Sequence, residues 1–116
     1  MRTGSELAAT DATRLHELTK GFERLGEILQ TEGGEHVLPG VRAITRILRA
    51  LGVQGLRTEQ DLDDVRSIYK DLLNGRGLLS DFYIWRDDFD ARRLANQDLR
   101  ALEDRLGRLL VNGPTR

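Results

Sequence analysis

Apolar residues recur at alternating spacings of three and four in four separate segments of this 116-residue chain. In the first segment the series is Leu15, Leu18, Phe22, Leu25 and Leu29. An α-helix completes a turn every 3.6 residues, so this spacing places all five side chains on one face. The pattern predicts a helix over residues 10–32, which Gly33 and Gly34 would end because glycine readily adopts the left-handed conformation.

The other three segments repeat the pattern. A second helix is predicted over residues 39–51, with Pro39 in the first turn, where the missing amide N–H would be unpaired anyway. A third is predicted over residues 58–74, with Thr58 and Asp61 resembling a capping box. The fourth is predicted to begin between residues 87 and 90 and to end at residue 111.

Four amphipathic helices joined by short links favour an all-α four-helix bundle, with up-down-up-down as the expected topology. The length fits a single domain, with a core over residues 10–111 and flexible termini at residues 1–5 and 113–116. The hydrophobic fraction is 39% and the charged fraction 32%, which suffices for a modest core.

Composition also excludes several classes of protein. The chain has no cysteine, which rules out disulfides, thiolate metal sites and cysteine nucleophiles. No apolar run reaches the length that a membrane span needs, and residues 1–5 do not resemble a signal peptide. A net charge of -1 does not favour nucleic acid as a partner. We expect a cytoplasmic protein without a membrane segment, a metal or a cofactor.

The segment over residues 76–86 does not follow the helical pattern. Four of the six aromatic residues lie between positions 82 and 89, namely Phe82, Tyr83, Trp85 and Phe89. A run of aromatic and β-branched residues favours extended backbone, so a short irregular or extended segment across one end of the bundle is expected. Tryptophan, tyrosine and arginine often dominate interfaces, and Arg86 follows directly. The alternative is that the rings close the core; alternate residues of an extended segment can do both.

A row of arginines marks the second predicted helix. Arg42, Arg46 and Arg49 are spaced so that they share the side opposite the apolar stripe. Arginine pairs well with carboxylate or phosphate, so this side could bind an acidic partner or could simply be solvated. RNA binding is not favoured, because the helix has no aromatic residue on which bases could stack.

Helix-borne carboxylates offer an enzymatic alternative. Glu23 and Glu27 lie one turn apart, and Asp61 and Asp64 lie near the start of the third helix. All-α nucleotide hydrolases hold a hard cation such as Mg²⁺ with carboxylates in this pattern. The simpler interpretation, which we prefer, is that the aspartates are N-terminal residues that complement the helix dipole. The two histidines, His16 and His36, do not form a recognisable zinc motif.

Three motifs resemble a family of small bacterial α-helical proteins of unknown function. They are Gly33-Gly34-Glu35-His36, the run from Gly75 to Ile84, and Asn96 in the last helix. The resemblance covers residues 15–110 and implies a bacterial cytoplasmic protein without known catalytic residues. Some proteins similar to this family act as immunity partners of secreted toxins.

Asp81 and Asn96 are the polar residues of most structural interest. Asp81 lies among apolar residues, and Asn96 lies beside the apolar stripe of the last helix. A partly buried carboxylate requires donors. We therefore expect Asp81 to fix the aromatic segment to the last helix with Asn96 as one donor, unless Asp81 is a solvated loop residue.

Together these features favour a non-enzymatic protein that binds another protein, such as a toxin. The aromatic segment would be the main contact and the arginine side of the second helix a secondary one. The expected binding residues are Phe82, Tyr83, Trp85, Arg86, Arg42, Arg46 and Arg49. Self-association is the other open possibility, because the leucine stripes would also suit a dimer core.

Overall fold

The computed structural model describes residues 4–75 and 78–111, with the backbone alone over residues 4–11. Within these ranges the chain forms four α-helices and two short 3-10 helices and contains no strand, which confirms the all-α prediction. The elements are α1 (Gly4–Thr31), α2 (Leu38–Gln54), η1 (Glu59–Leu62), α3 (Asp63–Asn74), η2 (Leu79–Asp81) and α4 (Phe89–Val111).

Three boundaries differ from the prediction by more than one residue, and one of them is the end of α2, which continues beyond residue 51 to Gln54. α1 begins at Gly4 rather than at residue 10, because residues 6–9 (Glu-Leu-Ala-Ala) are good helix formers that extend it backwards. Residues 4 and 5 are therefore helical; the rest of the predicted flexible termini lies outside the described residues. The third helix begins with the 3-10 turn η1, where the Asp61 carboxylate accepts hydrogen bonds from the amides of Arg57 (2.9 Å) and Thr58 (3.3 Å).

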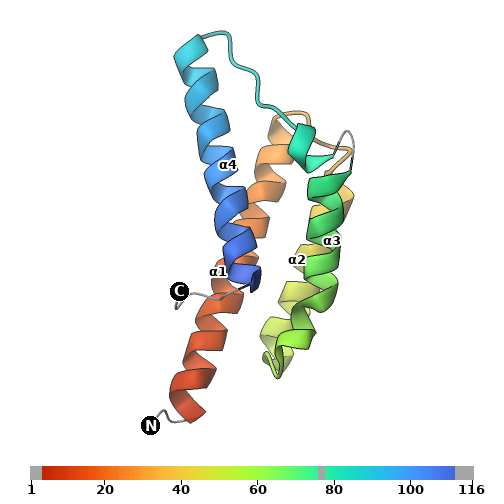
Figure 1. Cartoon of the computed structure of the whole chain (residues 1–116), viewed down its shortest axis with the longest axis vertical. Coiled ribbons are helices and arrows are strands. Elements are labelled where there is room, and N and C mark those ends of the chain that lie inside the picture. The colour runs from red at the N-terminus through yellow and green to blue at the C-terminus, as the bar shows by residue number, and fades with distance from the viewer. Residues whose placement is uncertain (1–3, 76–77, 112–116) are drawn as a thin grey trace.

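Helix α1 packs against both α2 and α4, and α2 also packs against α3. In Figure 1 the segment after α3 crosses the upper end of the molecule to the start of α4. The principal extents are 53 × 25 × 21 Å. The core contains all five residues of the first predicted stripe, each less than 6% exposed. Because this stripe is covered within one chain, a dimer would have to use another surface.

A cluster of charged residues holds the C-terminal end of α4. The buried Arg14 of α1 donates to the carbonyl oxygens of Leu109 (2.7 Å) and Leu110 (2.9 Å). Arg66 of α3 donates to the same Leu110 carbonyl at 2.8 Å. Glu59 accepts hydrogen bonds from both arginines. The last carbonyls of a helix have no partner within it and carry a partial negative charge, so these guanidinium groups satisfy them and join three helices.

Candidate binding surfaces

Residues 82–86 are extended, and their side chains alternate between core and solvent. Phe82 and Ile84 are buried at 6% and 4% exposure, whereas Tyr83 and Trp85 are 55% and 63% exposed. This is the alternation expected of extended backbone. It corrects one expectation: the Phe82 ring belongs to the core and offers no surface to a partner. Its side chain lies against the turn between α1 and α2.

Two residues of α4 hold this segment in place. The Asn96 side chain accepts a hydrogen bond from the Ile84 amide and donates to the Ile84 carbonyl, both at 2.8 Å. Arg100 donates to the Phe82 carbonyl at 2.5 Å and to both oxygens of Glu103 at 2.9 Å. Burial raises the pKa of Glu103, against the lowering effect of its hydrogen bonds from Arg100. The aromatic segment is thus fixed through its own backbone.

The structure places Asp81 and Asn96 differently. Asp81 is exposed and lies at the end of η2, so it is not a buried carboxylate that needs donors from α4. Asn96 does hold the aromatic segment, but its partner is the backbone of Ile84. Residue spacing could not distinguish these cases, because a backbone partner leaves no mark on the sequence.

An exposed cluster of rings and one cation lies where the segment joins α4. The Arg92 guanidinium carbon stands 4.3 Å from the centroid of the Trp85 ring and 5.5 Å from that of Phe89. The Trp85 indole N–H donates to Asp87 at 3.3 Å. Phe89 is 65% exposed, which is inconsistent with a role in closing the core. We call Tyr83, Trp85, Phe89 and Arg92 the aromatic surface.

Arg86 belongs to the support of this surface. Its two terminal nitrogens donate to the two oxygens of Glu32 at 2.7 and 2.6 Å, which joins the segment to the end of α1. These hydrogen bonds lower the pKa of Glu32. Because its donors face Glu32, Arg86 is engaged within the chain rather than open to a partner.

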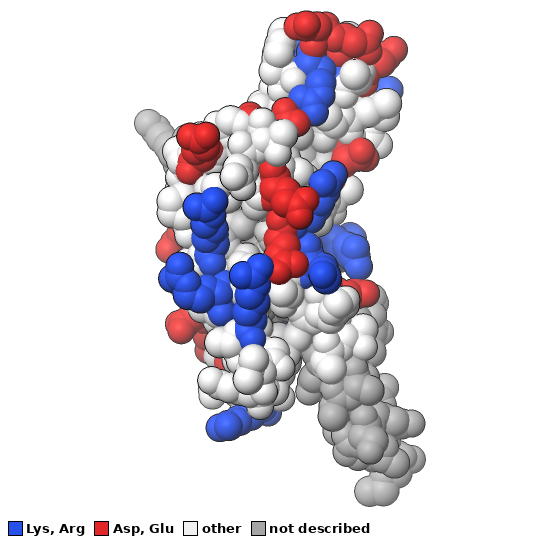
Figure 2. Space-filling view, turned by 180° about the vertical axis from the view of Figure 1, so that it is seen from behind, with Lys and Arg blue, Asp and Glu red and all other residues white. Residues whose placement is uncertain are grey.

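The three predicted arginines of α2 lie along a groove between α1 and α2. Figure 2 shows basic side chains gathered on this side of the molecule next to a column of acidic ones. The groove has a volume of about 490 Å³ and an apolar floor that includes Phe22, Leu38 and Val41. We call it the arginine groove, after Arg42, Arg46 and Arg49 in its wall.

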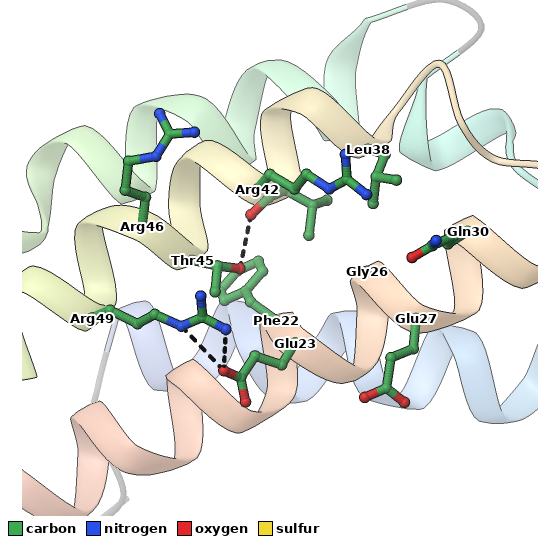
Figure 3. A pocket seen from close by; sticks show the side chains of 11 residues that line it. Phe22, Glu23, Gly26, Glu27, Gln30, Leu38, Arg42, Thr45, Arg46 and Arg49 are labelled. Atoms are coloured by element: carbon green, nitrogen blue, oxygen red, sulfur yellow. Dashed lines mark hydrogen bonds and ion pairs between the residues drawn. The ribbon is translucent and has the colours of Figure 1, made fainter.

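The arginines of this groove differ in their partners. Arg49 donates to Glu23 of α1 at 2.6 and 3.3 Å, and these bonds lower the pKa of Glu23 (Figure 3). Arg42 and Arg46 are exposed and form no ion pair or side-chain hydrogen bond within the described part of the chain. The sequence placed the three arginines on one face; the pairing of Arg49 with Glu23 depends on the packing of α1 against α2.

The carboxylates of the enzymatic alternative do not come together. Glu23 is paired with Arg49, Glu27 lies 3.6 Å from Arg24, and Asp61 caps η1. Among the described residues no group of three or more His, Cys, Asp or Glu side chains could hold a metal ion. The hydrolase alternative requires such a convergence of oxygen ligands and stays a prediction.

Comparison with known proteins adds no relative: no protein-family model, curated protein or solved structure matches the chain. The resemblance to small bacterial helical proteins therefore stays a prediction. Over the described residues no helix combines the length and the apolar character that crossing a membrane would require.

Proposed function

We propose that this protein is a non-enzymatic interaction module that binds another protein through its aromatic surface. The observation that supports this proposal is that the Trp85 side chain is exposed to solvent while the backbone around it is held by hydrogen bonds. Trp85 is 63% exposed, yet Asn96, Arg100 and Arg86 fix the backbone on either side of it. A large apolar ring held in solvent costs free energy that only a covering partner recovers.

Rigidity of this kind favours binding. Binding of a partner to Trp85 and Phe89 loses little conformational entropy, because the backbone of the segment is already held in place. Arg92 lies over both rings, and a cation–π contact strengthens when a partner removes the surrounding water. The surface thus combines the residue types that most often dominate the binding energy of protein interfaces.

The class of partner that we propose is a bacterial toxin, with this chain as its cytoplasmic immunity or antitoxin-like protein. In this proposal the four helices form an up-down-up-down bundle that presents the aromatic surface at one end. The basis is the resemblance described above together with the exposure of Tyr83, Trp85 and Phe89, which are 55%, 63% and 65% exposed. A second copy of the chain is the competing occupant of the same surface.

The test uses the single tryptophan of the chain as both probe and target. The protein is titrated with the product of a toxin gene that neighbours its own gene. We expect the emission of Trp85 to shift to shorter wavelength and its quenching by acrylamide to fall on binding. Trp85→Ala should weaken binding by more than about 1 kcal/mol while leaving the unfolding midpoint unchanged.

Val53→Ala is the matched control, since Val53 is another apolar residue, is 90% exposed and lies at the end of α2. Equal affinity of the wild type and Trp85→Ala would overturn the proposal. Unfolding of Trp85→Ala would show instead that the ring supports the fold. Sedimentation of the free protein as a dimer with its Trp85 emission already shifted would assign the surface to self-association.

A further inference from the structure

We propose that the arginine groove is a second binding surface, which takes an acidic helical segment of a protein partner. This goes beyond the aromatic surface, because the groove lies between α1 and α2 and shares none of the residues of that surface. The inference rests on the charges of the groove: Arg42 and Arg46 are exposed and form no ion pair within the described residues, whereas Arg49 pairs with Glu23.

Two positively charged side chains of the groove are not balanced by a neighbouring carboxylate. Glu23 faces Arg49, and Glu27 lies near Arg24, so both acidic residues of the groove have a cation beside them. Arg42 and Arg46 are the arginines of the groove that the described residues leave without an ion pair. They are four residues apart on α2, which places them one above the other about 5–6 Å apart at Cβ.

This spacing matches carboxylates one turn apart on a partner helix. An arginine fork pairs with a carboxylate through two parallel hydrogen bonds, so two glutamates at positions i and i+4 could each meet one guanidinium. The apolar residues that line the groove, Phe22, Leu38 and Val41, are at most 6% exposed, so the contacts open to a partner come from the arginines. An acidic helix provides the carboxylates that these arginines would bind.

Gly26 lines this groove. It lies within α1, where glycine costs about 1 kcal/mol relative to alanine. A Cβ added there would meet Leu38 at 3.7 Å and Val41 at 3.8 Å, which is ordinary contact. Gly21 of the same helix differs, because a Cβ there would overlap the Leu106 side chain. Packing therefore explains Gly21 but does not require a glycine at position 26.

The surroundings favour a protein segment over a nucleic acid. Phe22 in the floor is fully buried, so the groove offers no exposed ring on which a base could stack.

The test measures binding of a labelled amphipathic peptide with glutamates four residues apart and leucines on the adjoining face. A second peptide carries lysines in place of the glutamates. At physiological salt we expect fluorescence anisotropy to show binding of the acidic peptide at least tenfold tighter than that of the basic one. The double variant Arg42→Glu/Arg46→Glu should lose at least tenfold in affinity.

Two further variants distinguish binding in the groove from non-specific electrostatic attraction to the protein. Arg57→Glu/Lys70→Glu makes the same change of charge at exposed positions outside the groove and should bind the acidic peptide as the wild type does. Gly26→Met fills the groove without changing charge and should weaken binding at least tenfold. A Cβ at Gly26 makes ordinary contacts and methionine is a better helix former than glycine, so the unfolding midpoint of this variant should not fall below that of the wild type.

Amide chemical shifts then locate the peptide. The proposal requires changes at Gly26 and Thr45 and none at the Trp85 indole, so its failure is distinguishable from failure of the aromatic surface. Equal binding of both peptides, equal losses in the two charge-reversed variants, or full affinity of Gly26→Met would each refute it. Tighter binding of a single-stranded RNA with the same dependence on Arg42 would assign the groove to nucleic acid instead.

Discussion

Arg14 is the residue whose role was hardest to see in the sequence. It precedes the first leucine of a stripe on α1, where an arginine would ordinarily be solvated, yet its side chain is 5% exposed. Its guanidinium reaches two carbonyls at the far end of the chain and the carboxylate of Glu59. A buried charge is tolerated only when its donors are paired, and here they are.

We predict that Arg14→Met lowers the free energy of unfolding by about 2–4 kcal/mol, because it leaves the α4 carbonyls and Glu59 short of donors. Urea denaturation would measure the loss. Arg105→Met is the control: Arg105 pairs with Glu17 at 3.3 Å but is 56% exposed. Its loss should stay below about 1 kcal/mol. Similar losses in both variants would show that the cap contributes no more than a surface ion pair.

The aromatic segment is an element without regular secondary structure that is nevertheless fixed. Its backbone makes few bonds to itself, so the side chains of α4 supply the partners that a helix or sheet would otherwise provide. Asn96 satisfies both the amide and the carbonyl of Ile84, and this pins the alternation that buries Ile84 and exposes its neighbours.

Asn96→Ala should therefore destabilise the protein by about 1–3 kcal/mol, since both backbone groups of Ile84 lose their partner. Alanine is the better helix former, so the loss would come from these hydrogen bonds. The variant should also lower the fluorescence anisotropy of Trp85, because the segment that carries it is released. Gln97→Ala, at a neighbouring exposed position, should do neither; a fixed Trp85 in Asn96→Ala would contradict the anchoring role.

At the scale of the whole molecule, carboxylates with a lowered pKa join separate elements. Hydrogen bonds from Arg49, Arg86 and Arg14 lower the pKa of Glu23, Glu32 and Glu59 respectively. These contacts link α1 to α2, α1 to the aromatic segment, and η1 to α1. Protonation of these groups would weaken several junctions together.

We predict that the unfolding free energy decreases as the pH falls below the ordinary glutamate pKa of 4.5. The sign follows because these carboxylates bind protons less tightly in the folded state, so their contribution is present above that pH and is lost below it. The raised pKa of Glu103 acts in the opposite direction and reduces stability as the pH rises above 4.5.

Denaturant midpoints measured between pH 3 and pH 7 would test this prediction. The triple variant Glu23→Gln/Glu32→Gln/Glu59→Gln should lose less stability on acidification than the wild type, and high salt should also reduce the difference. Identical pH profiles for the two proteins would place the acid sensitivity in other groups.

The sequence by itself determined the helices and the faces that they bury. The spacing of Leu15, Leu18 and Phe22 is local information, because helical geometry fixes which residues share a face whatever the helix packs against. The same holds for the arginine row of α2 and for the extended run that ends at Trp85. The beginning of α1 was less well predicted, because capping and propensity signals compete there.

Only the tertiary structure decided which polar groups meet across the chain. Arg14 and Leu109 are 95 positions apart, and Asn96 binds a backbone rather than the Asp81 side chain that residue types suggested. The pairing of Arg49 with Glu23, which leaves Arg42 and Arg46 without an ion pair within the described residues, likewise depends on how α1 and α2 approach each other. Such contacts depend on the distances between helices in the folded protein. The spacing of apolar residues along the sequence does not determine those distances.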